Sequence, residues 1–375
     1  MSSSAPVATA GTFAALLSRR GNSFGFVRLA LACLVILSHS WTLGGHGSEA
    51  LQAGTKETLG RLAVYGFFAL SGFLIAQSYQ STGSVVRFFW HRALRIGPGY
   101  YACLLVTALV LSSMQRLWES GSLAGHAQDI GAFLYANKTL RIHSYSIGKT
   151  LSDHPYGYVW IGALWTLIYE FKCYVLAAVL GVTGILRRAP LLVLLGYVAT
   201  LAAVAVETAH EGALQSISPL WIDPPLIEFV PCFLAGMVAW LYRDRIRSSG
   251  ALAALLFAGA LVVLCAWPAW FTLAAVATVP YVTLYLAARL PIRELERHGD
   301  LSYGMYLYGF PVQQLLVTTG AASLGPVVFA LLAIVATVPF AAGSWFLVER
   351  PMLRLKNVSL PLALLWQRRV GKNAS

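Results

Sequence analysis

The chain has 375 residues, of which 58% are hydrophobic and 11% are charged, and its formal net charge is +12. Soluble domains carry about 25% charged residues, so these few charges cannot cover the apolar surface of a soluble fold. The basic residues form short clusters between long apolar runs and are not interleaved with aromatic residues on one soluble face. This pattern excludes a nucleic-acid-binding domain and indicates an integral membrane protein.

Ten segments are long and apolar enough to cross a bilayer. They are 24–43, 60–79, 98–117, 159–182, 189–207, 226–243, 250–267, 269–287, 302–319 and 324–347. The first is too long for the core of a signal peptide, so we expect it to be retained. The predicted fold class is an all-α polytopic membrane protein, a bundle of about ten transmembrane helices.

The positive charges predict the orientation. Basic clusters occupy every second junction between the apolar segments and both ends of the chain, which places these junctions and both termini in the cytoplasm. We therefore expect a cytoplasmic tail over 1–23, a transmembrane domain over 24–356 and a second tail over 357–375, in a multi-pass protein of the inner (plasma) membrane. The loop 118–158 is the only sizeable outward segment. It suits a lid or an acceptor-binding loop, and a simple connector is an equally good alternative.

The first apolar segment contains Arg28 and His39, eleven positions apart. On a helix this spacing puts them within ~20° of one face and ~16 Å apart along the axis. A histidine at mid-membrane can take a proton from a hydroxyl, and an arginine near the cytoplasm can hold a phosphate. The alternative is a histidine that only packs between helices and an arginine that only extends to the interface.

A second basic feature, Arg92 and Arg95, lies at the cytoplasmic end of the second helix, just before Pro98. Two arginines three positions apart share one side of a helix and can grip a polyphosphate. Ordinary cytoplasmic anchoring is the alternative, and charge alone favours it.

Two further segments carry polar groups at membrane depth. Glu170 lies in the fourth segment, where a buried carboxylate can orient an imidazole or bind sugar hydroxyls. An ion pair with an arginine elsewhere is the structural alternative. Tyr303 belongs to a tyrosine-rich run, 301–311, which can line a sugar or pantetheine channel or can form an aromatic belt at the interface.

The five cysteines are spread over separate apolar segments and have no metal-ligand spacing. We therefore expect them to pack as small hydrophobic side chains, and we predict no metal site. Gly66, Gly72 and Gly236 permit close helix packing within or between chains, so the oligomeric state stays open.

Taken together and in order, these segments resemble the acyltransferase-3 family of integral membrane acyltransferases, from about 24 to 354. The matching positions are Arg28 with His39, the run 67–75, Arg92 and Arg95 before Pro98, the block Trp165, Thr166, Leu167, Glu170 and Tyr174, and Glu349-Arg350-Pro351. One departure is Phe171, because many members have a second acidic residue there. The chain also lacks the hydrolase-like domain that many relatives carry after the last helix, which suggests a stand-alone enzyme.

The resemblance implies transfer of an acyl group, usually acetyl from acetyl-CoA, to a hydroxyl of a glycan or lipid-linked sugar. Together with the residue chemistry it suggests that Arg28, Arg92 and Arg95 bind the phosphates of the donor and that His39 is the general base. Glu170 would then orient the base or bind the acceptor. Ser71, Tyr303 and Trp165 are the expected substrate contacts.

Three points stay open on the sequence alone. The acyl group can pass directly to the hydroxyl or through a transient acyl-histidine. A glycan or lipid transporter without bond chemistry is the main rival, although neither internal repeats nor paired broken helices support it. A sensor in which His39 is a pH switch is the second rival.

Overall fold

The computed structural model describes residues 11–14, 23–52, 54–82, 84–217, 223–292 and 299–357. Most of the two predicted tails, 1–23 and 357–375, lies outside the described residues. The helices longer than two turns are α2 (Phe24–Leu43), α3 (Leu59–Thr82), α4 (Val85–Val106), α5 (Ser112–Ser120), α6 (His126–Ala136), α7 (Leu167–Val182), α9 (Pro190–Ala209), α11 (Pro224–Leu241), α12 (Gly250–Ala266), α13 (Phe271–Arg289), α15 (Ser302–Thr318) and α16 (Pro326–Ser344). Short helices include α8 (Ile185–Arg188), α10 (Ala213–Ile217), η3 (Leu164–Thr166) and α17 (Arg350–Leu353).

The described part of the chain is helical. Its β-type pairing is limited to an isolated antiparallel bridge between Thr12 and Arg247. Among the described residues, eight helical segments are long and apolar enough to cross a membrane. The predicted spans 250–267 and 302–319 correspond to two further helices of 17 residues each, α12 and α15. The polytopic helical class is therefore confirmed, while the count of ten spans and the cytoplasmic position of both termini stay predictions.

Helix α4 differs from its predicted boundary. The sequence places the start of this span at about Pro98, but the helix begins at Val85 and continues through η2 (Thr107–Leu111) and α5 as one segment of 36 residues. Pro98 removes only one intrahelical hydrogen bond, and packing on both sides keeps the helix continuous. Arg92 and Arg95 thus lie in the first turns of α4, not at the end of α3.

Helices α3 and α11 cross in close contact at the centre of the bundle. A Cβ atom on Gly72 would lie 1.9 Å from the carbonyl oxygen of Phe233, and one on Gly236 would lie 2.0 Å from that of Ala69. Any side chain at either glycine would push the two helices apart. This confirms the expected role of these two small residues in close packing within one chain.

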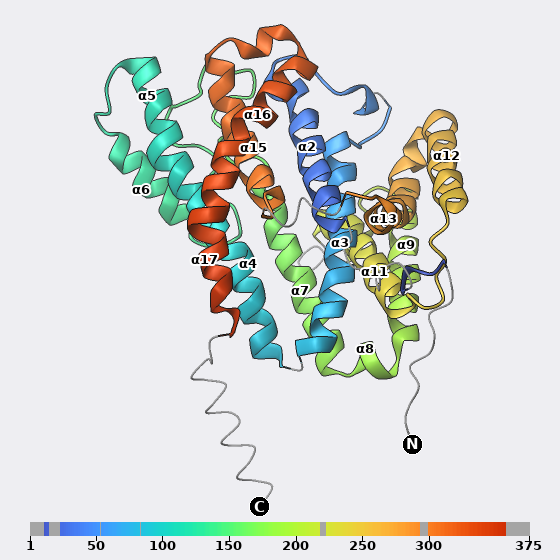
Figure 1. The fold of residues 1–375 in the computed structure, drawn as a ribbon. Coiled ribbons are helices and arrows are strands. Elements are labelled where there is room, and N and C mark those ends of the chain that lie inside the picture. The colour runs from blue at the N-terminus through green and yellow to red at the C-terminus, as the bar shows by residue number, and fades with distance from the viewer. Residues whose placement is uncertain are drawn as a thin grey trace, which may run out of the picture.

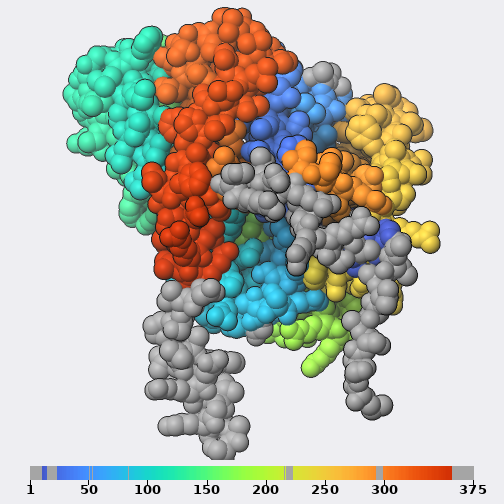
Figure 2. Space-filling model, viewed as in Figure 1, coloured from blue at the N-terminus to red at the C-terminus, as the bar shows by residue number. Residues whose placement is uncertain are grey.

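The predicted loop 118–158 is partly helical, because it contains the end of α5 and all of α6. These two helices form a hairpin at the upper left of the bundle, at the end opposite α8 (Figure 1). In the space-filling view they form a lobe beside the helices of the bundle (Figure 2). From Asn137 to Ala163 the chain is irregular, and this stretch returns over the ends of α2 and α15.

Candidate active site

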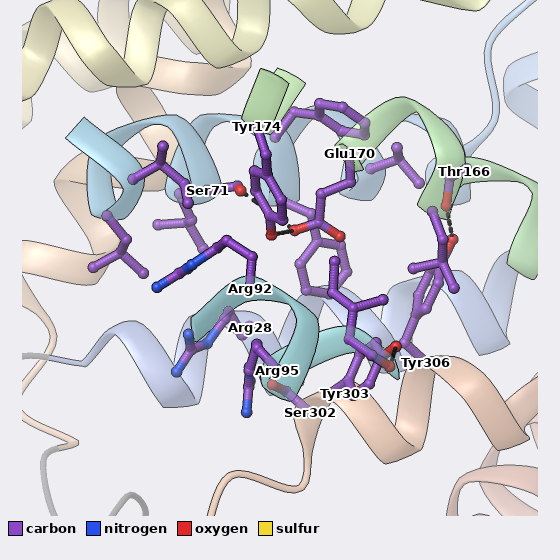
Figure 3. Close-up of a pocket in the computed structure, with 18 residues that line it drawn as sticks. Arg28, Ser71, Arg92, Arg95, Thr166, Glu170, Tyr174, Ser302, Tyr303 and Tyr306 are labelled. Carbon is purple, nitrogen blue, oxygen red and sulfur yellow. Dashed lines mark hydrogen bonds between the residues drawn. The ribbon is translucent and has the colours of Figure 1, made fainter. Parts of the chain in front are cut away.

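A cavity of about 130 Å³ lies between α2, α3, α4, α7 and α15. Its lining includes six of the eight residues that the sequence nominates: Arg28, Ser71, Arg92, Arg95, Glu170 and Tyr303. The three arginines gather on one side of the cavity, whereas Thr166 and Tyr306 close the opposite side (Figure 3). Five helices far apart in the sequence therefore bring one set of polar side chains together.

The arginine side is organised by Asp300, which precedes α15. Oδ2 of Asp300 lies 3.1 Å from Nη2 of Arg28 and also pairs with Arg95, while Oδ1 accepts a hydrogen bond from Ser302 Oγ at 2.5 Å. Burial alone would raise the pKa of Asp300, but the charges of Arg95 and Arg28 lower that pKa below its usual range. Asp300 is therefore ionised and holds the two guanidinium groups side by side.

Arg92 has a different environment. Its guanidinium group lies 5.8 Å from the ring centre of Tyr174 and 5.9 Å from that of Phe88, and Nη2 donates to Ser78 Oγ at 3.4 Å. Its Nε atom is buried and has no hydrogen-bond partner within the described ranges. No carboxylate of the described chain forms an ion pair with Arg92. A partly buried cation that lacks an anionic partner among the described residues is suited to bind an anion that enters the cavity.

Glu170 lies on the next wall of the cavity. Its Oε1 atom accepts hydrogen bonds from Ser71 Oγ, at 3.3 Å, and from the hydroxyl of Tyr174. The arginine ion pair considered as an alternative for Glu170 is not observed in the described part of the chain. The neighbouring Lys172 turns away and pairs with Asp223 at 2.8 Å.

Tyrosines of α15 line the cavity at successive turns. Tyr303 donates its hydroxyl proton to the carbonyl oxygen of Ile96 at 2.8 Å, and the guanidinium group of Arg95 lies 5.7 Å from the centre of its ring. One turn further on, Tyr306 is hydrogen-bonded to Thr166 and to the carbonyl oxygen of Ala163, the latter at 2.7 Å. Tyr306 and Thr166 thus form the wall farthest from the arginines.

His39 lies outside this cavity lining, farther along α2 from Arg28. Its ring packs edge-on against Phe310, with 5.2 Å between ring centres, and it has no hydrogen-bond partner among the residues described. Phe310 follows Tyr306 by one helical turn of α15. The structure therefore leaves His39 outside the cavity that the arginines line, and it does not bring Glu170 into hydrogen-bond contact with His39.

Trp165 also lies outside the cavity lining. Its indole packs against Tyr169 and Phe229, with ring centres 5.7 and 5.8 Å apart. In this position it supports the start of α7 from behind and makes no contact with the cavity.

Sequence reasoning missed Asp300, and it included Tyr306 only as part of the tyrosine-rich run 301–311. Asp300 is separated from Arg28 and Arg95 by some two hundred positions or more, so no local pattern signals its ion pairs. Its only signal is its place directly before the tyrosine-rich run. A metal site needs a cluster of at least three His, Cys, Asp or Glu side chains, and the described residues contain no such cluster.

Comparison with known proteins shows the family of this chain. Residues 22–346 match the family described as an acyltransferase domain. The chain belongs to the acyltransferase-3 family. It is therefore an acyltransferase, and its apolar helices make it a multi-pass membrane protein. This membership confirms the resemblance that the sequence motifs carry and favours an enzyme over a transporter or a sensor.

Two curated relatives align along nearly their whole length. An O-acetyl transferase of Shigella phage Sf6 is 26% identical over 350 residues, covering 92% of this chain and 99% of the relative. Nodulation protein 10 of Rhizobium leguminosarum bv. viciae is 28% identical over 350 residues, covering 89% of this chain and 94% of the relative. No solved structure matches the chain significantly.

Proposed function

We propose that this acyltransferase moves an acetyl group from acetyl-CoA to a hydroxyl of a cell-envelope or exported glycan, within the inner membrane. The observation that carries this proposal is the convergence of Arg28, Arg92 and Arg95 on one side of a cavity that also contains Ser71 and Glu170. The name of the phage relative, an O-acetyl transferase, supports oxygen as the acceptor atom and acetyl as the transferred group.

The arginine side suits the phosphates of the donor. Guanidinium groups bind phosphate oxygens through paired, charge-assisted hydrogen bonds, and these bonds strengthen where water is excluded. Arg92 supplies a cation without a carboxylate partner, while Asp300 keeps Arg28 and Arg95 oriented toward the same region. The pantetheine arm then extends along α2, in the direction of His39.

The chemistry needs a base near the acceptor hydroxyl. In the proposed step His39 takes the hydroxyl proton while the oxygen attacks the thioester carbonyl carbon, and the carbon–sulfur bond then breaks. The protonated His39 returns the proton to the departing thiolate, so the products are the acetyl ester and CoA and no net proton is released. Direct transfer requires no covalent enzyme intermediate.

One feature of the site supports a role for movement in this reaction. Tyr306 and Thr166 are hydrogen-bonded between the cavity and the turn of α15 that carries Phe310. The thioester must pass this wall to reach His39. We therefore assign Glu170, Ser71 and Tyr303 to the binding and orientation of the donor's thioester end, within the cavity that they line.

The test is acyl transfer by purified protein in nanodiscs. Acetyl-CoA and oligosaccharides released from the envelope of the expressing cells are supplied, and CoA release and acetylated sugar are both measured. Wild type, His39→Ala and the control His210→Ala are compared, since His210 is an exposed histidine at the end of α9.

We expect acetylated sugar from wild type and from the control, and at least a hundred-fold lower rate from His39→Ala, as for loss of a general base. Transfer that survives in His39→Ala would move the base elsewhere. Correctly folded wild type that releases no CoA with any acyl-CoA donor would overturn the proposed reaction.

A further inference from the structure

An aromatic contact series connects His39 to an exposed ring by way of residues that do not line the cavity. Phe310 packs against His39, and the ring of Tyr156 packs against Phe310 with 6.2 Å between centres and an interplanar angle of 71°. Phe310 is 4% exposed, whereas Tyr156 is 43% exposed. An accessible aromatic ring is therefore connected through one buried ring to the proposed base.

The segment that carries Tyr156 is held firmly by α15. Gln314, fully buried, donates from Nε2 to the carbonyl oxygens of Tyr156 and Val159, both at 2.7 Å, and its Oε1 lies 3.1 Å from Nδ1 of His154. Because Gln314 follows Phe310 by four positions, both side chains lie on the same face of α15. One face of α15 thus carries Phe310 and also positions Tyr156, which packs on it.

The same segment is anchored to α2 and to α5. Gly45, just beyond α2, lies so close to Pro155 that a Cβ atom added to Gly45 would be 3.1 Å from the proline ring. The backbone N–H of Leu151 donates to Glu119 of α5 at 2.8 Å. Leu151 and Tyr158 adopt φ values of +67° and +62°, which cost energy for non-glycine residues and persist only where the surroundings enforce them.

The neighbouring side of α2 is fixed in a similar way. Gln313 donates to the carbonyl oxygen of Ile36 at 2.9 Å and to Ser40 Oγ at 2.8 Å, and these two residues flank His39 in sequence. Consecutive glutamines of α15 therefore hold the helix that carries His39 and the segment that carries Tyr156 (Figure 1 shows α15 beside α2). Helix α15 therefore fixes the position of the Tyr156 segment relative to the turn of α2 that carries His39.

From this geometry we infer that Tyr156 forms the acceptor subsite, where a sugar ring of the glycan stacks on the exposed tyrosine and presents a hydroxyl toward His39. The inference rests on the proposed function, because it takes His39 as the base. Pyranose C–H groups pack well on aromatic faces. Tyr145, which is 37% exposed, lies near Tyr156. Burial is the main cause that raises the pKa of Tyr145, and the charge of Tyr156 raises that pKa further.

The position is chemically consistent with two separate substrate entries. The arginines that suit the phosphates of the donor line the cavity together with Tyr306, whereas Tyr156 packs on Phe310, one turn farther along α15. A charged donor and a neutral sugar therefore approach the base from opposite ends of α2.

Two measurements test the subsite in intact protein in nanodiscs, each with wild type, Tyr156→Ala, Tyr156→Phe and the control Tyr135→Ala. Tyr135 is a 71% exposed tyrosine on α6, in the same outward region. The first is the KM for envelope oligosaccharide and, separately, for acetyl-CoA. The second is binding of the same oligosaccharide without a donor, by saturation-transfer NMR.

We expect Tyr156→Ala to raise the acceptor KM and weaken oligosaccharide binding by about ten-fold, as for loss of one aromatic stacking contact. The KM for acetyl-CoA stays unchanged, and Tyr156→Phe and Tyr135→Ala behave like wild type. An unchanged acceptor KM and binding in Tyr156→Ala would overturn the subsite and leave the transferase intact. Binding that depends on Tyr156 without any turnover would support the subsite and reject the reaction. Wild type that neither binds nor acetylates the sugar would reject both.

Discussion

Arg28 of α2 and Arg95 of α4 are joined through a single carboxylate oxygen, Oδ2 of Asp300, which lies 3.1 Å from Nη2 of Arg28. The side chains of Arg28 and Arg95 are 23% and 22% exposed, and that of Asp300 is 14% exposed. The three groups form a compact charged unit at one side of the cavity. Removal of the Asp300 carboxylate takes away the charge that joins these two cations in a poorly solvated place.

The first prediction concerns this anion. Asp300→Asn should lower the free energy of unfolding by about 3 kcal/mol, as for breaking a buried ion pair, and should raise the KM for acetyl-CoA while leaving that for the sugar unchanged. Thermal unfolding and initial rates in nanodiscs measure both effects. Asp153→Asn, on an exposed loop, is the control. Equal stability and donor KM in Asp300→Asn would show that Asp300 does not organise the arginines.

The second prediction concerns Arg92. Arg92→Gln should raise the KM for acetyl-CoA by about ten- to a hundred-fold, because a hydrogen bond to a charged group contributes about 1.5–3 kcal/mol. Arg188→Gln, an exposed arginine of α8 at the same end of the bundle, is the matched control. Dephospho-CoA donors with fewer phosphates should respond less to the substitution. A donor KM equal in both variants would leave Arg92 as a membrane anchor.

The third prediction concerns the α3–α11 crossing. Gly72→Ala would place a methyl group 1.9 Å from the carbonyl oxygen of Phe233, so the helices must separate. We expect a loss of about 3 kcal/mol of stability and a low yield of folded protein, as for severe overpacking. Gly259→Ala on α12, where nothing lies within 4 Å of the added atom, should be neutral. Equal melting temperatures for the two variants would contradict the close crossing.

The fourth prediction concerns a buried carboxylate at the other end of α3. Glu57 and Glu228 lie 3.0 and 2.6 Å from the hydroxyl of Tyr65, which has one proton to donate. Burial first, and then the charge of Glu228, raise the pKa of Glu57 against the effect of Arg61. A raised folded-state pKa means that the folded protein binds more protons, so stability falls as pH rises from the unfolded pKa through the folded one.

Glu57→Gln removes this titration. The melting temperature of wild type should therefore fall more steeply than that of Glu57→Gln as the pH is raised from about 4 toward neutrality. Glu211→Gln, whose exposed carboxylate pairs with Lys56 at the surface, should keep the wild-type profile. Parallel profiles for wild type and Glu57→Gln would show that Glu57 is ionised throughout this range.

Local patterns predicted the helices well, because the bilayer demands a long apolar run with every backbone group satisfied inside the helix. The predicted span 24–43 coincides with α2, and most others differ by a few residues. The error at α4 arose where a polar, proline-containing stretch continues a helix beyond the apolar run. The helix α6 was missed because it lies in a segment without a spanning hydrophobic pattern.

The site was only partly accessible from the sequence. Arg28, Arg92, Arg95, Ser71, Glu170 and Tyr303 stand out because polar groups at membrane depth are costly, and they do line one cavity. Their relation to His39 was not predictable. Helix spacing places His39 about 16 Å from Arg28 on one face, but it does not reveal that His39 packs on Phe310 of α15 and stays outside the cavity that Arg28 lines.

The sequence by itself determined that this is a multi-pass helical membrane protein of an acyltransferase family and which polar side chains are candidates for its chemistry. These conclusions depend on composition, helical period and short motifs, which are local properties of the chain. Only the tertiary structure decided that Asp300 joins two of the arginines, that Trp165 stays outside the cavity, and that Tyr156 reaches the ring beside His39. Those relations depend on how distant helices pack, and packing is set by the shapes of all the contacting side chains together.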